Sequence, residues 1–191
     1  MKKLAIFASG NGSNAQQIIA YLESHPTLRI GLVVSNKENA GVLEKAEKLG
    51  IPTRVLPKPD WVNETIVLDL LKSFEIEGIV LAGFLLKIPA FLVQAFPGRI
   101  LNIHPALLPK FGGKGMYGMH VHEAVKNSGD RITGITIHEV NEVYDQGKIV
   151  FQASCEVLET DTAEAIAGKV QQLEHLHFPG VVASYFAEDK A

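Results

Sequence analysis

The sequence predicts an α/β fold, because seven short runs rich in Val, Ile and Leu alternate along the chain with amphipathic segments. The first five runs are short, largely apolar and rich in Val, Ile and Leu, which is typical of strands buried on both faces of a parallel sheet. A loop that could close a long hairpin separates the last two runs. We therefore expect an open, mostly parallel twisted sheet, Rossmann-like in its amino-terminal half, with an antiparallel hairpin in the carboxyl-terminal half.

The expected elements follow one another along the chain. Strands are expected within residues 4–9, 29–35, 51–56, 78–84, 99–104, 134–140 and 148–157. Helices are expected near residues 14–24, 40–49, 61–75, 88–95, 118–128 and 162–185. Asp60 or Asn63 is expected to cap the third helix. No repeat, low-complexity tract or linker interrupts these elements, so we interpret residues 1–191 as a single domain.

The composition favours small-molecule partners. The formal net charge is −3 and no cluster of Lys and Arg occurs, which argues against a nucleic-acid partner. The apolar run at residues 4–8 is too short for a signal-peptide core, and no stretch approaches the ~18 apolar residues of a membrane span. A single cysteine, Cys155, fits a reducing compartment. We expect a cytoplasmic protein without membrane contact, with monomer and homodimer both open.

A glycine-containing turn, "SGNGSNAQ", joins the first strand to the first helix. This arrangement offers backbone N–H groups and a positive helix end to an anion. Gly10 and Gly12 would allow close backbone approach, and Ser13 or Asn14 is expected to cap the helix. The turn therefore predicts a site for a phosphate ester.

Two alternatives to phosphate-ester binding stay open for this turn. With Ala15, the two glycines fit the G-x-G-x-x-A pattern of dinucleotide-binding proteins. Ser35 and Asn36 stand where a ribose-binding Asp or Glu would be wanted, which disfavours NAD, although Ser35 and Lys37 could accommodate the extra phosphate of NADP. The turn could also be purely structural.

Two polar side chains, Asn102 and His104, interrupt the apolar run "RILNIH". In a strand they point to the same face, whereas Leu101 and Ile103 point to the other. Pro105 helps to end the strand, which places the pair at its carboxyl end, where ligands bind in open α/β sheets. The alternative is a buried pair satisfied by neighbouring carbonyl groups.

The Asn102 and His104 pair suits acyl transfer. An amide can stabilise a developing oxyanion while an imidazole donates a proton. No G-x-S-x-G motif or activated cysteine supplies a nucleophile, so direct attack of one bound substrate on another is the economical mechanism.

Four ordered motifs together resemble the folate-dependent formyltransferases. They are "GNGSN" at residues 10–14, "LAGF" at 81–84, "NIHPALLP" at 102–109 and "YDQG" at 144–147. The resemblance covers essentially the whole chain. It implies that 10-formyltetrahydrofolate, as co-substrate, donates a formyl group to the glycine amine of 5′-phosphoribosylglycinamide in de novo purine (IMP) biosynthesis.

The same resemblance implies roles for individual residues. Asn102 would be the oxyanion donor, His104 the general acid, and Asp145 the carboxylate that keeps His104 protonated by raising its pKa. The substrate phosphate would bind to Gly12, Ser13 and Asn14, and the glycinamide group to Gln171 and Glu174. The folate would contact Phe84, Leu85, Leu86, Asn102, Asn141, Glu142, Val143, Tyr144 and Asp145.

Three segments depart from the family pattern. "FLLKIP", residues 84–89, is one residue shorter than in relatives and lacks their Arg. Some relatives have an Arg before the third helix. The corresponding segment here, "DWVNETI", has no Arg, and Asn63 is its nearest polar candidate. The segment 111–120 is unusually rich in glycine, and we expect it to be a mobile lid that orders over substrate.

The remaining histidines are assigned weaker roles. Two His-x-His pairs, His120 with His122 and His175 with His177, have poor chelating geometry on a helix, so no metal is expected. His120 is expected to line the site through the lid. For His138 two interpretations stay open, a wall of the site or a satisfied strand residue.

Several rival functions remain at this point. Formyltetrahydrofolate hydrolase (deformylase) and methionyl-tRNA formyltransferase share the fold, but each would need an additional domain, for which 191 residues leave no room. A non-catalytic phosphoribosyl-ligand binding protein would explain the glycine turn but not Asn102, His104 and Asp145 together. An NADP-dependent oxidoreductase is the most distant alternative.

Overall fold

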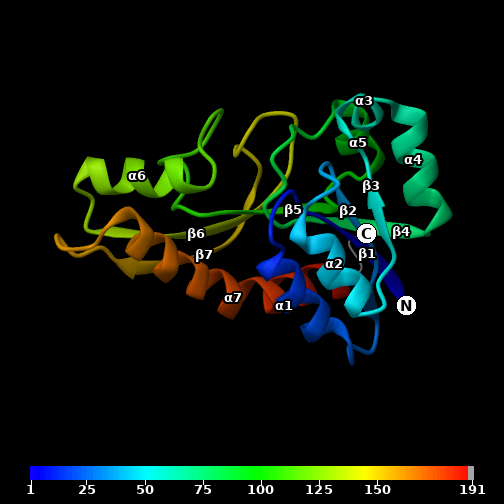
Figure 1. Ribbon diagram of the computed structural model, residues 1–191, viewed down its shortest axis with the longest axis horizontal. Coiled ribbons are helices and arrows are strands. Elements are labelled where there is room, and N and C mark those ends of the chain that lie inside the picture. The colour runs from blue at the N-terminus through cyan, green and yellow to red at the C-terminus, as the bar shows by residue number, and fades with distance from the viewer. Residues whose placement is uncertain (189–191) are drawn as a thin grey trace.

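A computed structural model describes residues 1–188 and contains one seven-stranded sheet with helices on both sides (Figure 1). The strand order is β3-β2-β1-β4-β5-β6-β7. Strands β1 to β5 are parallel, whereas β6 is antiparallel to both β5 and β7. The expected α/β fold and hairpin are therefore confirmed. Residues 189–191 of the expected domain 1–191 lie outside the described residues.

The strand bounds follow the apolar runs closely. The strands are β1 (Lys2–Phe7), β2 (Leu28–Ser35), β3 (Thr53–Val55), β4 (Ile76–Leu81), β5 (Ile100–His104), β6 (Ile132–Glu139) and β7 (Ile149–Glu156). The helices are α1 (Ser13–Leu22), α2 (Gly41–Lys48), α3 (Lys58–Trp61), α4 (Glu64–Ser73), α5 (Ala90–Ala95), α6 (Met119–Ser128) and α7 (Ala163–Ala187). Within residues 1–188, no helix is both long and apolar enough to span a membrane.

The helices form two layers over the sheet. In Figure 1, α1, α2 and α7 lie on one side of it and α3, α4 and α5 on the other. Each layer of helices packs on the sheet to form a separate hydrophobic core. Neighbouring residues of β5 point into different cores: Leu101 and Ile103 belong to the α1/α2/α7 core, and Ile100 belongs to the α3/α4/α5 core. The expected alternation of β5 is therefore confirmed.

The helix expected over residues 61–75 is confirmed as α4, but it begins at Glu64, after the separate short helix α3. Helix α3 ends at Trp61, and the Asn63 side chain accepts a hydrogen bond from the Ile66 N–H to begin α4. Trp61 is buried, and its indole N–H donates to the Lys87 carbonyl at 2.9 Å. Asn63 is thus the cap of α4, and its side chain is committed to this role.

The expected capping of α1 by Ser13 or Asn14 was also wrong. The N-cap is Gly12, in a left-handed conformation with φ of 76°, and no side chain caps the helix. A Cβ atom on Gly12 would lie 2.5 Å from Val42 Cγ2 of helix α2. Glycine is required here both by the backbone conformation and by close packing against α2.

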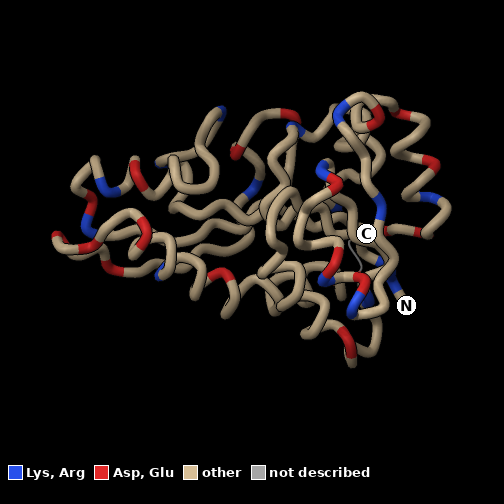
Figure 2. Tube along the Cα trace, viewed as in Figure 1, with Lys and Arg blue, Asp and Glu red and all other residues tan. Residues whose placement is uncertain are grey.

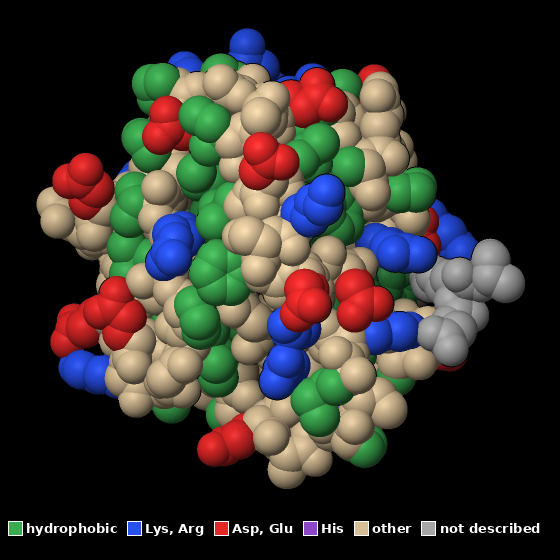
Figure 3. Space-filling view, turned by 90° about the vertical axis from the view of Figure 1, so that its right-hand side faces the viewer, with side chains coloured by type: hydrophobic (Ala, Val, Ile, Leu, Met, Phe, Trp, Pro, Cys, Tyr) green, Lys and Arg blue, Asp and Glu red, His purple; other side chains and the backbone are tan. Residues whose placement is uncertain are grey.

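Charges of both signs are spread along the chain. Figure 2 shows Lys and Arg interspersed with Asp and Glu over helices and loops, and the face in Figure 3 carries both signs among hydrophobic side chains. A nucleic-acid site would need a continuous basic surface, which this face does not present.

Candidate active site

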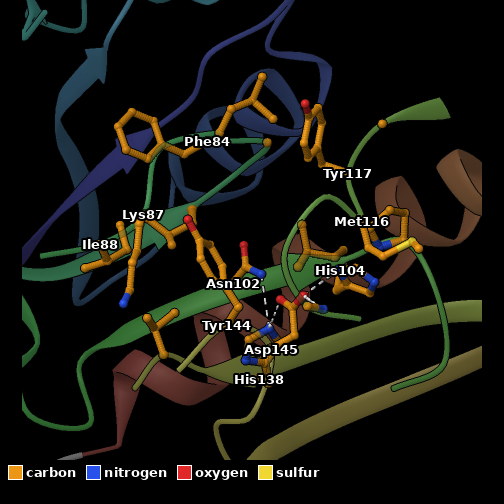
Figure 4. A pocket seen from close by; sticks show the side chains of 18 of the residues that line it. Phe84, Lys87, Ile88, Asn102, His104, Met116, Tyr117, His138, Tyr144 and Asp145 are labelled. Atoms are coloured by element: carbon orange, nitrogen blue, oxygen red, sulfur yellow. Dashed lines mark hydrogen bonds and ion pairs between the residues drawn. The ribbon is translucent and has the colours of Figure 1, made fainter. Parts of the chain in front are cut away.

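A cavity of about 460 Å³ opens at the carboxyl ends of β4 and β5. Its walls come from five regions: the end of β5 with the β6 residue His138, residues 83–88 after β4, the glycine-rich segment with α6, the β6–β7 loop, and Asn14 of α1 with the facing residues of α7. Figure 4 shows Asn102, His104, His138 and Asp145 meeting in the cavity, with Phe84 and Tyr144 nearby. The residues expected to be catalytic therefore lie together.

The β5–β6 register places Asn102 against His138. The two residues are paired across the antiparallel strands, and Asn102 Nδ2 lies 3.0 Å from His138 Nε2. His138 Nδ1 lies 2.8 Å from the Glu139 carbonyl oxygen, which can only accept, so we assign the ring proton to Nδ1. Nε2 then accepts from the Asn102 amide and fixes its orientation. One N–H of Asn102 remains available to a ligand. His138 is thus both a satisfied strand residue and a wall of the site.

Two acceptors face the buried His104 ring. Nε2 donates to the Phe111 carbonyl at 2.8 Å, and Nδ1 lies 3.6 Å from Asp145 Oδ2. Asp145 also accepts a 2.8 Å hydrogen bond from the Gly113 N–H, and its Oδ1 lies 3.6 Å from His138 Nε2. A ring with an acceptor on each side can hold a proton on each nitrogen, which is what a general acid needs.

The expectation that Asp145 raises the pKa of His104 holds in direction but does not decide the net result. Burial lowers the pKa of His104, Asp145 and the Phe111 carbonyl raise it, and the net pKa lies below the ordinary value. For Asp145, burial raises the pKa, whereas the Gly113 N–H and His104 lower it, and the net pKa lies below the ordinary value. Asp145 is therefore a carboxylate at neutral pH.

Unusual backbone conformations hold both of the groups that face His104. Phe111 and Asp145 are two of only three non-glycine residues within 1–188 with positive φ, each at 55°. Gly112 packs between them, since a Cβ there would lie 2.5 Å from Leu108 Cδ2 and 3.3 Å from Asp145 Cβ. Such strained positions often occur at functional sites, where the surrounding structure maintains them.

The residues expected to bind the ribonucleotide adjoin the cavity at one end. Asn14, Gln171 and Glu174 line it, whereas Gly12 and Ser13 do not. Asn14 Nδ2 donates to Glu174 Oε2 at 2.8 Å, which fixes the orientation of the Asn14 side chain. Burial raises the pKa of the Glu174 carboxyl, although the hydrogen bond from Asn14 opposes this.

The residues expected to bind the folate line the other part of the cavity. They are Phe84, Leu85, Leu86, Asn102, Asn141, Glu142, Val143, Tyr144 and Asp145. Two of their neighbours support this wall. The Ser9 hydroxyl accepts a hydrogen bond from the Leu85 N–H, and Lys87 Nζ lies 5.8 Å from the centre of the Tyr144 ring. Lys87 was not among the expected site residues, although it stands in the shortened segment "FLLKIP".

The expectation that His120 lines the site was wrong, because its neighbour His122 does so instead. His120 is exposed and lies beside Glu123, whereas His122 is buried and lines the cavity. Helix α6 begins at Met119 and buries Val121, His122 and Val125 on one face. The apolar spacing of Val121 and Val125 was the signal that could have identified His122.

The other His-x-His pair lies away from the cavity. His177 packs against Phe151 with ring centres 5.0 Å apart, and His175 Nε2 is buried without a partner within residues 1–188. In the same range, no group of three or more His, Cys, Asp or Glu side chains is arranged to hold a metal ion.

Comparison with known proteins agrees with this geometry. Residues 2–182 match the formyl transferase family. Phosphoribosylglycinamide formyltransferase of Bacillus subtilis is 39% identical over 95% of this chain and 93% of its own length. The chloroplastic enzyme of that name from Arabidopsis thaliana is 45% identical over 98% of this chain, but the chain spans only 66% of that relative.

Solved structures give the same result. The crystal structure of phosphoribosylglycinamide formyltransferase from Bacillus halodurans aligns over 99% of this chain and 97% of its own, with a TM-score of 0.88 and 33% identity. The Brucella melitensis structure of the same name aligns over 100% and 98%, with a TM-score of 0.87 and 35% identity. Because some relatives are chloroplastic, the cytoplasmic location stays a prediction. The chain belongs to the formyl transferase family.

Proposed function

We propose that this protein transfers the formyl group of 10-formyltetrahydrofolate to the glycine amine of 5′-phosphoribosylglycinamide, a step of de novo purine biosynthesis. The observation that carries the proposal is the convergence of Asn102, His104 and Asp145 in one cavity. The names of the bacterial and plant relatives support the choice of acceptor.

In the proposed first step the amine attacks the formyl carbon directly. A bond forms between the amine nitrogen and this carbon, and the carbonyl electron pair moves onto the formyl oxygen. The second N–H of Asn102 donates to the resulting oxyanion, because His138 accepts only the first and both residues line the cavity.

In the proposed second step His104 donates a proton to the departing folate nitrogen. The bond between that nitrogen and the formyl carbon breaks as the carbonyl re-forms, and the attacking nitrogen loses its extra proton to solvent. Burial disfavours the imidazolium, but Asp145 and the oxyanion both favour it. The proton is thus held most firmly when the intermediate forms.

The two substrates are proposed to enter from opposite ends of the cavity. The main chain at Gly12, Ser13 and Asn14 would hold the phosphate, with Glu174 and Gln171 at the glycinamide group. The folate would lie along the wall formed by residues 84–86 and 141–145. Its apolar and aromatic side chains, among them Phe84 and Tyr144, suit a planar pterin ring.

The test is an absorbance assay of purified protein with both substrates, beside a control without the amine. We expect folate release only when 5′-phosphoribosylglycinamide is present, with formylated amine as the product. Equal release of folate without the amine would contradict the proposal and identify a hydrolase. No release in either reaction, with ribonucleotide bound, would identify a binding protein.

A further inference from the structure

Three histidines line the cavity, and only one has no hydrogen bond from its ring. Both nitrogens of His138 face partners, in Asn102 and Glu139, and both nitrogens of His104 face Phe111 or Asp145. His122 is buried, with 6% of its surface exposed, and within residues 1–188 no group bonds to either of its nitrogens. Only Nδ1 is fully enclosed without a partner, so Nε2 is the ring nitrogen that can reach a ligand in the cavity.

The position of the unpartnered atom indicates the tautomer of His122. Its Nδ1 is buried without a partner. A proton on Nδ1 would bury an N–H without an acceptor, which native proteins avoid more strictly than a buried acceptor without a donor. The proton of the neutral ring therefore belongs on Nε2, and His122 offers an N–H donor.

The surroundings of His122 keep the ring neutral. Burial lowers its pKa, and the positive charge of protonated His104 lowers it further. The two rings are thus distinguished by their neighbours, because Asp145 faces His104 and favours its charged form. The two histidines therefore suit different roles, because His104 can transfer a proton, whereas His122 can only donate a hydrogen bond.

The proposed reaction lacks a second donor to the oxyanion. Oxyanion sites commonly use two N–H donors, and Asn102 has only one free N–H because His138 accepts the other. His122 lines the same cavity from α6, immediately after the glycine-rich segment.

We propose that His122 is this second donor, contacting the oxyanion on the former formyl oxygen through Nε2–H. The inference rests on the proposed function and extends it by a catalytic residue. No proton leaves His122 in this step. The electron pair moves from the carbonyl to its oxygen and back again, and His104 alone supplies the proton to the folate nitrogen.

The test compares His122→Ala and His122→Gln with the wild-type protein, and uses the exposed His120→Ala as a matched control. We expect His122→Ala to lower kcat about 10²- to 10³-fold, the usual effect of removing one oxyanion donor, with both KM values within about threefold. Glutamine keeps an N–H donor, so His122→Gln should recover at least tenfold of the loss. His120→Ala should match wild type.

Three results would overturn the proposal. They are an unchanged kcat in His122→Ala, a raised KM with normal kcat, and no recovery in His122→Gln although its melting temperature matches wild type. If His122→Ala fails to fold, the test rests on comparing His122→Gln with the wild-type protein. A folded glutamine variant that has lost its kcat refutes the donor role, and a folded glutamine variant that keeps its kcat supports it. Wild-type turnover is measured in the same series, so a failure of the proposed function is recognised separately.

Discussion

The same edge of the sheet carries two polar clusters with different chemistry. After β1 and β2, the Ser9 hydroxyl donates to Asn36 Oδ1 at 2.6 Å and accepts from the Leu85 N–H at 2.9 Å. At the end of β5, His104 faces Asp145 of the β6–β7 loop. Both are ionisable, and Asp145 and Phe111 have strained backbone conformations. The first cluster is neutral and uses its hydroxyl fully.

The difference separates supporting a site from performing chemistry. A neutral cluster whose hydrogen-bonding groups already have partners holds a loop in place and offers no free group to a ligand. A cluster with a shifted pKa and unused N–H groups on Asn102 and His122 can stabilise charge that appears only during reaction. Changes in the second cluster should therefore affect turnover, and changes in the first should affect stability.

The largest effect is expected for His104→Ala. Removing the general acid should lower kcat by about 10³-fold, while the ribonucleotide still binds, because the imidazole serves the transition state more than the ground state. Steady-state kinetics and calorimetric titration of 5′-phosphoribosylglycinamide measure the two effects. Near-normal turnover would contradict the assigned role.

Asp145→Asn should have the next largest effect, lowering kcat by about 10²-fold. The amide no longer raises the pKa of His104, so burial lowers this pKa further. The limb of the pH profile on which activity falls with rising pH should move to lower pH. An unmoved limb in the variant would refute the electrostatic role of Asp145.

Gly112→Ala tests the packing behind the catalytic groups. Its new methyl would lie 2.5 Å from Leu108 Cδ2 and displace Asp145, so kcat should fall about 10- to 100-fold. Gly168→Ala is the control, since a methyl on this α7 glycine meets nothing within 4 Å. Equal activities of the two variants would show that Asp145 tolerates displacement.

Ser9→Ala breaks the neutral cluster. It leaves the Leu85 N–H without its acceptor, so the free energy of unfolding should fall by about 1–3 kcal/mol, with kcat within about threefold of wild type. Urea unfolding beside the exposed Ser24→Ala variant measures the difference. A large loss of kcat at unchanged stability would reverse the distinction between the clusters.

The smallest effect is expected from acidification. The pKa values of His104 and His122 are lowered in the folded protein, so below about pH 6.5 the unfolded chain binds more protons. Stability should therefore fall as the pH drops from 7 towards the lowered pKa values of the two histidines. His122→Gln should flatten this dependence and His120→Gln should not. Stability that rose on acidification would have the wrong sign.

Local patterns predicted most of the fold and half of the catalytic cluster. Strand alternation placed Asn102 and His104 on one face, and Pro105 placed them at the end of β5. The contact between Asn102 and His138 was not predictable, because it depends on the β5–β6 register. Asp145 was identified through family resemblance alone. Its backbone is left-handed, but the residue is not a glycine, so the sequence carries no local signal for this conformation.

The errors arose where tertiary packing overrides local propensity. Gly12, not Ser13 or Asn14, caps α1, because α2 packs directly against this turn. His122, not His120, lines the cavity, because it lies on the helix face that Val121 and Val125 bury. The glycine-rich segment lines the cavity, but its closure over substrate stays a prediction.

Direct formyl transfer between two bound molecules is the central claim, and a quenched single-turnover experiment tests it most directly. Wild-type protein is mixed with 10-formyltetrahydrofolate labelled in the formyl carbon and with 5′-phosphoribosylglycinamide, and the label is followed in protein, formate and ribonucleotide. We predict that label reaches the ribonucleotide at the rate of folate release and never attaches to protein. Labelled protein that precedes the product, or label recovered as formate, would contradict the account.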